Sequence, residues 1–257
     1  MEIIDHKLDS AAQRPMRQLK RITPKLIIIH YTAGGSLDSS WNAMDRNGLS
    51  AHLLIDRDGT VVQMADFNRR ANHAGKSQWN SLSWLNNHSI GIEVCNYGWL
   101  PKQGDGVFKR TKAQGATPAF SADQVIVASH KNGWPKDFGW EIYPEAQLEA
   151  TENVCRALVA AYPTVTDIVG HDEVSPERKQ DPGPAFPITD LRLLVDPQDP
   201  PGDAADEVGI IASGPVFADH VVTAVSGLNM RSAPAVGAAV RDVLRHGQVV
   251  RCGPQSG

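Results

Sequence analysis

The segment that most constrains the fold is a run of four apolar residues, Leu26 to Ile29, which is followed at once by His30. A short run of this kind, rich in β-branched side chains, is typical of a strand that is fully buried in a sheet. We therefore expect a covered sheet, with a polar side chain held rigidly where this strand ends.

Further strands are predicted by short apolar or alternating stretches at 51–55, 61–64, 89–94 and 167–170. The Asp58-Gly59 pair between the first two stretches is typical of a hairpin turn. These stretches supply the neighbours that a buried strand requires.

Two segments have apolar residues at helical spacing. One runs over 36–47, where Ser36 can cap the helix and Gly48 stops it. The other runs over 148–162 and ends before Pro163. Helices and strands mixed in this order predict an α/β fold, with a central mixed β-sheet flanked by helices.

The predicted domain is interrupted once and then ends at a linker. The stretch from 98 to about 140 lacks a clean period apart from one helical candidate at 122–130, which is typical of a functional loop or insertion. A stretch rich in Pro and Asp over 196–207 predicts a linker. We therefore expect a main domain over 1–195, with its core at about 23–190, and a small β segment over 208–257.

Composition excludes several classes of function. The 257 residues carry a formal net charge of −4 with both signs interspersed, so we expect no nucleic-acid partner. No apolar stretch is long enough for membrane insertion. Three widely spaced cysteines predict neither a disulfide framework nor a thiolate metal cluster.

The first residues lack the pattern of a secretory signal, so we expect a cytoplasmic location or delivery by another route. No pattern indicates an oligomeric state.

Three residues have the chemistry of a metal site. His30 and His171 each follow a predicted strand, and Asp181 lies ten positions after His171 in a loop that its prolines would stiffen. Two imidazoles and a carboxylate, with an open position for water, suit a catalytic zinc ion. Because the chain has nine histidines, spacing alone leaves a chance pairing open.

Two charged residues are candidates for catalysis. Glu93 lies within an otherwise apolar strand, where it can act as a general base toward a water molecule or point to solvent. Lys179 lies two positions before Asp181, where its ammonium group can stabilise an oxyanion or be an ordinary solvated charge. The local pattern alone does not decide between these readings.

Five sequence strings carry a family resemblance: LIIIHYTAG at 26–34, SAHLLIDRDG at 50–59, NHAG at 72–75, NNHSIGIE at 86–93 and GHDEVSPERKQDPGP at 170–184. In this order they resemble the type-2 N-acetylmuramoyl-L-alanine amidases, a family that includes the peptidoglycan recognition proteins and the anhydromuropeptide amidases. The resemblance runs from about 23 to 187, and the last string is its most specific part.

The resemblance implies a mixed sheet flanked by helices, with a zinc cleft on one side. It also implies hydrolysis of the amide between N-acetylmuramic acid and L-alanine in peptidoglycan or muropeptides. On the family pattern, His30, His171 and Asp181 fall on the zinc ligands, Glu93 on the catalytic glutamate and Lys179 on the lysine that stabilises the transition state. Without a signal sequence, a muropeptide-recycling enzyme in the cytoplasm or an enzyme delivered to the cell wall is compatible with this pattern.

Three further residues in the family strings do not match ligand positions. His52, in an alternating strand, is expected to be a structural hydrogen-bonding histidine. His73 and Asn72 lie in a loop that resembles a cleft wall, so both are candidates for substrate binding. The family often has a tryptophan where this chain has Asn72, and this departure would alter packing against the substrate without touching the chemistry.

The C-terminal segment and two rival functions complete the expectations. The string at 228–234 resembles the opening of a bacterial SH3-type domain, of which only about half is present. A module that recognises muropeptides without cutting them is one alternative function, although the ligand set is complete. A zinc endopeptidase that cuts within the stem peptide is another, and only product analysis separates it from an amidase.

Overall fold

The computed structural model of the protein describes residues 1–17, 19–104 and 106–195, and the backbone of four strands between 218 and 252. The chain forms two units, Met1–Asp196 and Pro197–Gly257, and each is described by itself. No helix among the described residues has both the length and the apolar character needed to cross a bilayer.

The first unit is built on a mixed sheet, as the sequence predicts, and this sheet has six strands. Its strand order is β13-β4-β9-β5-β6-β3, and the pairs are parallel except for the antiparallel pair β5 and β6. The bounds are β3 (Ala12–Gln13), β4 (Leu26–Tyr31), β5 (Leu53–Ile55), β6 (Val61–Gln63), β9 (Ser89–Val94) and β13 (Asp167–Gly170). The predicted hairpin is therefore confirmed as β5 and β6, and β4 includes His30 rather than ending before it.

Side chains of β4 and β9 alternate between the two faces of the sheet, which separates the core from the site. One face packs against α2 (Glu145–Ala161), and its buried side chains include Ile27, Ile29, Ile90, Ile92, Val154 and Leu158. Because the side-chain period of a strand is two, His30 and Glu93 lie on the opposite face. The predicted helix at 148–162 is confirmed, although it begins three residues earlier.

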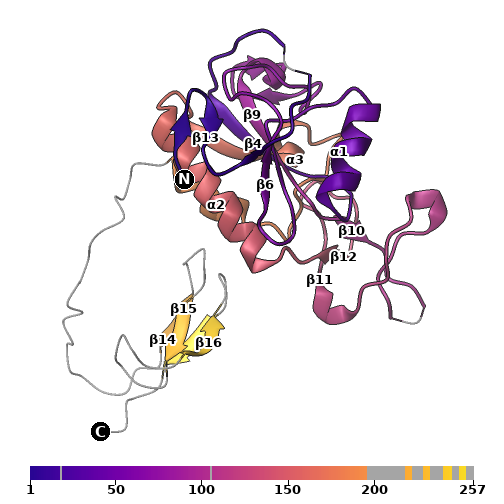
Figure 1. Ribbon diagram of the computed structural model, residues 1–257. Coiled ribbons are helices and arrows are strands. Elements are labelled where there is room, and N and C mark those ends of the chain that lie inside the picture. Colours follow the sequence, from indigo (N-terminus) through magenta and orange to yellow (C-terminus); the bar gives the residue numbers. More distant parts are fainter. Residues whose placement is uncertain are drawn as a thin grey trace, which may run out of the picture. The chain divides into compact units, whose positions relative to one another are not determined.

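The helix α1 (Leu37–Arg46) packs on the face opposite α2, against Leu54 and Met64. Figure 1 shows the two helices on either side of the strands. The side chain of Ser36 accepts a hydrogen bond from the backbone N–H of Ser39, which confirms the predicted cap. Helices cover both faces, so the predicted fold of a mixed sheet flanked by helices is confirmed.

The stretch between β9 and α2 forms a small antiparallel sheet with the order β10-β12-β11, which projects from the main sheet in Figure 1. Its strands are β10 (Trp99–Leu100), β11 (Val125–Ala128) and β12 (Phe138–Glu141). The predicted helix at 122–130 is wrong: a single 3-10 turn at Ala122–Gln124 leads directly into β11. The run of β-branched residues from Val125 to Val127 favours a strand, and pairing with β12 stabilises it.

The remaining elements are short. The N-terminal stretch contributes β3 to the edge of the main sheet by pairing with β6. The other bounds are β1 (Ile3–Ile4), β2 (Lys7–Leu8), β7 (Gln78–Trp79), β8 (Leu82–Ser83), the 3-10 turns Leu85–Asn87 and Lys112–Gln114, α3 (His171–Val174) and α4 (Ile188–Arg192).

The second unit contains two antiparallel strand pairs. β14 (Ala218–Val221) pairs with β17 (Val249–Cys252), and β15 (Leu228–Arg231) pairs with β16 (Val240–Leu244). The predicted linker at 196–207 lies outside the described residues. The resemblance of this segment to an SH3-type domain stays a prediction.

Candidate metal centre

The candidate ligands meet where three parallel strands end. β13, β4 and β9 are adjacent and parallel, so their carboxyl ends lie at one edge of the sheet. His30 is the fifth residue of β4 and pairs directly with Glu93 of β9. On the other side of β4, β13 ends at Gly170 and His171 begins α3. The fold thus brings these side chains together from segments far apart in sequence.

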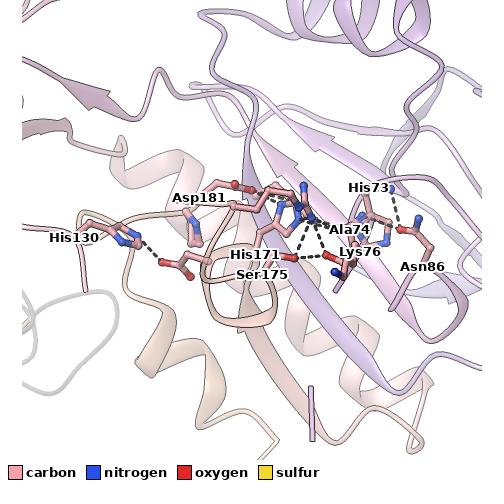
Figure 2. Close-up of polar contacts among 12 residues, drawn as sticks. His73, Ala74, Lys76, Asn86, His130, His171, Ser175 and Asp181 are labelled. Carbon is pink, nitrogen blue, oxygen red and sulfur yellow. Dashed lines mark hydrogen bonds and ion pairs between the residues drawn. The ribbon is translucent and has the colours of Figure 1, made fainter. Parts of the chain in front are cut away.

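Two histidine nitrogens and one carboxylate oxygen converge at this edge. Nδ1 of His30 lies 2.8 Å from Nδ1 of His171 and 3.0 Å from Oδ2 of Asp181. Nδ1 of His171 lies 2.9 Å from the same Asp181 oxygen, and the labelled pair is visible in Figure 2. All three side chains are buried, with exposed fractions of 1%, 1% and 6%. Together they form a compact group of metal-binding atoms.

The outer nitrogen of His171 has a fixed partner. Nε2 lies 3.1 Å from the carbonyl oxygen of Ala74, which can only accept a hydrogen bond. The side chain of Arg178 donates to the same carbonyl at 2.8 Å and also bonds to Ser175, drawn in Figure 2. With the ring proton on Nε2, Nδ1 of His171 presents a lone pair toward Asp181.

The outer nitrogen of His30 also has a partner, the ring of His73. Nε2 of His30 lies 3.0 Å from Nδ1 of His73. Burial and the neighbouring His171 lower the pKa of His30, Asp181 opposes them, and the pKa that results is about 4. Both rings are therefore neutral at pH 7, since burial also places the pKa of His73 well below its usual value.

The donor set fits a divalent metal ion. Burial alone would raise the pKa of Asp181, but His171 and His30 outweigh it and hold that pKa well below its usual range, so the group is a carboxylate. Two imidazole nitrogens and a carboxylate oxygen, all within 3.0 Å of one another, place electron-rich atoms face to face. Such an arrangement favours a cation at the centre of the group.

Glu93 lies beside this cluster in a half-buried position. Burial and the charge of Asp181 raise the pKa of its carboxyl group, the ammonium group of Lys179 opposes both, and the pKa that results is about 8. The same ammonium group also acts on His30. Both predicted catalytic residues therefore lie within electrostatic reach of the three candidate ligands.

The insertion between β9 and α2 is fastened to the loop that carries Asp181. Nε2 of His130 lies 3.0 Å from Oδ2 of Asp172, which Figure 2 shows, and Lys131 forms an ion pair with the other oxygen at 3.1 Å. The side chain of Asn132 donates to the Asp172 carbonyl at 2.9 Å. The backbone N–H of Asp172 in turn donates to the Asp181 carbonyl at 2.7 Å. We refer to these contacts of Asp172 as the Asp172 clamp.

The clamp is not evident from the sequence, because His130 and Asp172 are 42 positions apart and no family string contains His130. The adjacency of Asp172 to His171 is the only sequence signal that singles it out. The predicted structural role of His52 is confirmed, since Nε2 bonds to the Arg69 carbonyl at 2.7 Å and Nδ1 accepts from the Gly91 N–H at 2.9 Å.

The two residues predicted to bind substrate occupy different environments. His73 is buried, and its ring nitrogens lie against His30 and Ser89. Asn72 is half-buried, and its backbone exchanges hydrogen bonds with Ser50. Substrate contact stays a prediction for both residues.

Comparison with known families identifies the class of protein. Residues 20–184 match the family described as N-acetylmuramoyl-L-alanine amidase, so the chain belongs to that family. The match covers every strand of the main sheet except β3, together with all three candidate metal ligands, Glu93 and Lys179. The expected family membership is thereby confirmed.

Two curated relatives and one crystal structure illustrate the similarity. The chain is 32% identical over 148 residues to 1,6-anhydro-N-acetylmuramyl-L-alanine amidase AmpD of Escherichia coli, covering 57% of this chain and 58% of that protein. It is 28% identical over 175 residues to N-acetylmuramoyl-L-alanine amidase AmiD of Escherichia coli, covering 65% and 51%. The chain thus spans about half the length of these relatives. The crystal structure of a selenomethionine derivative of AmpD covers 76% of this chain and all of its own, with 25% identity and a TM-score of 0.51.

Proposed function

We propose that the chain is a zinc-dependent amidase that hydrolyses the amide bond between N-acetylmuramic acid and L-alanine. The observation that carries this proposal is the convergence of His30, His171 and Asp181 beside Glu93, in a chain of the N-acetylmuramoyl-L-alanine amidase family. The substrate is peptidoglycan or a soluble muropeptide.

His30, His171 and Asp181 would hold the metal ion. Two imidazole nitrogens and one carboxylate oxygen suit Zn²⁺, and a three-residue ligand set leaves a position open for water. When bound, zinc lowers the pKa of that water and polarises the carbonyl group of the substrate.

Glu93 is the proposed general base and then the general acid. Its carboxylate takes a proton from the water that attacks the lactyl carbonyl carbon. The same carboxyl group then gives that proton to the alanine nitrogen as the carbon–nitrogen bond breaks. The raised pKa of Glu93 supports this role, because a group that titrates near neutral pH can both accept and return a proton.

Lys179 is the proposed stabiliser of the oxyanion. Negative charge develops on the carbonyl oxygen during attack, and a fixed ammonium group in a sheltered site stabilises that charge strongly. The effect of Lys179 on the pKa values of Glu93 and His30 supports its position near the reacting atoms.

The names of the relatives support the proposed substrate class. AmpD is described as an amidase of 1,6-anhydro-N-acetylmuramyl-L-alanine, and AmiD as an N-acetylmuramoyl-L-alanine amidase. The crystal structure of AmpD shares the fold with this chain.

The test is mass spectrometry of purified muropeptides, with 1,6-anhydro and reducing-end forms incubated separately with zinc-loaded protein. We expect release of intact stem peptide with a free L-alanine amine. The matched control is Glu93→Gln, which keeps the shape of the side chain and should retain zinc while losing at least about 100-fold in turnover.

Each other outcome identifies an alternative. Peptides cut internally would make the chain an endopeptidase, and binding without cleavage by the zinc-loaded protein would make it a recognition module. Full activity of Glu93→Gln would show that another residue is the base. Metal analysis of the active protein that found no zinc would overturn the choice of metal.

A further inference from the structure

The ring of His73 lies between His30 and Gly91, in space that the absence of a side chain at residue 91 leaves open. Ser89, Gly91 and Glu93 are alternate residues of β9, so they line the same face of the sheet as the side chain of His30 in β4. A Cβ atom at Gly91 would lie 2.4 Å from Cγ of His73, so the ring fits there only because residue 91 is glycine. The backbone N–H groups of His73 and Ala74 both donate to the side-chain oxygen of Asn86, at 3.0 and 2.7 Å, and this holds the loop in place.

The hydrogen-bond partners determine which nitrogen of His73 carries the proton. The hydroxyl of Ser89 donates its one hydrogen to the Leu85 carbonyl at 2.6 Å, so it can only accept from Nε2 of His73 at 3.3 Å. Nε2 of His73 is therefore the protonated nitrogen. In a neutral imidazole, Nδ1 is then an acceptor.

This assignment passes to His30. Since Nδ1 of His73 is an acceptor, Nε2 of His30 at 3.0 Å must donate to it. Nδ1 of His30 then carries no proton and presents its lone pair toward His171 and Asp181. The chain of hydrogen bonds from the Leu85 carbonyl through Ser89 and His73 thus determines that Nδ1 of His30, which faces the other two candidate ligands, carries no proton.

We infer that His73 is a positioning residue that holds His30 in the tautomer and ring orientation required for metal binding. This role differs from the substrate contact predicted from the sequence, and it rests on the proposal that His30 is a metal ligand. Without an acceptor at residue 73, the proton of a neutral His30 is free to move to Nδ1 and bond to Asp181. A metal ion would then have to displace that proton, so the affinity of the protein for the metal ion would fall.

The first measurement uses the metal-free wild-type protein. Long-range proton–nitrogen NMR correlations report which ring nitrogen of each histidine carries hydrogen. We expect the Nε2–H tautomer for both His30 and His73. An Nδ1–H tautomer at either ring would overturn the inference, whatever the variants do.

The second measurement compares zinc affinity by competition with a chelator. His73→Phe keeps a ring but removes the acceptor, and we expect zinc affinity to fall about 10- to 100-fold. His73→Gln keeps an acceptor oxygen, and we expect affinity within a few-fold of wild type. Ser89→Ala leaves the His73 tautomer unspecified and should give a smaller loss than His73→Phe.

His52→Gln is the matched control, because His52 is also a buried histidine, its ring lies edge-on to that of His73, and its ring nitrogens bond to the backbone groups of Arg69 and Gly91. It should lower the melting temperature without a comparable loss of zinc affinity. If His73→Phe folds and binds zinc as tightly as wild type, or if His52→Gln loses as much affinity, the inference is wrong. Failure of the wild-type protein to bind zinc would instead overturn the proposed function.

Discussion

The two sides of the candidate metal centre are supported in different ways. On the strand side, His30 is backed by side chains, His73 and then Ser89, which lie in or against the sheet. On the loop side, His171 is backed by the Ala74 backbone carbonyl, and Asp181 is held through the Asp172 clamp. Single substitutions of the supporting side chains should therefore weaken the strand side. The loop side instead depends on the insertion packed against it.

The largest expected effect comes from the ligand that carries a charge. Asp181→Asn keeps the size of the side chain but removes the only anionic group of the cluster. We expect zinc affinity to fall by more than the roughly 10- to 100-fold that changes in supporting residues cause. Chelator competition measures this loss, and Asp58→Asn, in the exposed turn between β5 and β6, is the control. Unchanged affinity in Asp181→Asn would remove this residue from the ligand set.

A smaller effect is expected when the clamp is broken from the insertion. His130→Ala removes a buried partner of Asp172, which we expect to cost about 1–3 kcal/mol of unfolding free energy. Zinc affinity should fall about 10-fold, because the loop that carries Asp181 loses support. Denaturant unfolding and chelator competition give the two values.

The neighbouring Lys131 provides the matched comparison for the clamp. Its side chain is 45% exposed, so the ion pair with Asp172 is screened by solvent and Lys131→Ala should cost less than about 1 kcal/mol. If both variants leave zinc affinity at the wild-type value, the insertion does not support the metal centre, and the comparison between the two sides fails.

The smallest expected effect is a pH-dependent change in the free energy of unfolding. It tests Glu93 and not the metal ligands. The pKa of Glu93 is raised to about 8 in the folded protein, so the native state binds more protons than the unfolded state between about pH 5 and 8. In the metal-free protein this group stabilises the fold at low pH, and that stability is lost as pH rises toward 8. Relative to wild type, Glu93→Gln should gain on the order of 1–2 kcal/mol between pH 5 and 7, reduced by the partial exposure of the side chain.

Urea titrations of the metal-free wild type and Glu93→Gln at several pH values measure this difference. The gain should grow with pH, since the cost of ionising this half-buried carboxyl group is present only in the wild type. A difference that is constant across pH, or that shrinks as pH rises, would contradict a raised pKa for Glu93.

Much of the fold is predictable from local pattern. The apolar run at 26–29, the Asp58-Gly59 turn and the periodic helix at 148–162 each specify one element, and all three form as expected. The stretch at 122–130 misleads because a capped turn begins it while a β-branched run continues it. Pairing with β12, which lies further along the chain, decides that conflict in favour of a strand.

The residues of the candidate site are predictable from the sequence, but the hydrogen bonds that connect them to supporting residues are not. Family strings single out His30, His171 and Asp181, and the fold brings them together. The contact between His30 and His73 joins residues 43 positions apart, and no local rule predicts it. One signal was available: Ser89 and Gly91, both small, share a strand face with Glu93 and leave room for a ring.

The pairing of β4 with β9 also limits how this protein can change over evolutionary time. His30 and Glu93 are direct partners in one register, so deletion of a single residue within either strand would turn a ligand or the base toward the α2 core. Length changes are instead tolerated beyond the strand ends, and the insertion begins only after β9 has ended at Val94. Loops around this site are therefore free to diversify in length, while the two strands must keep their length and register together.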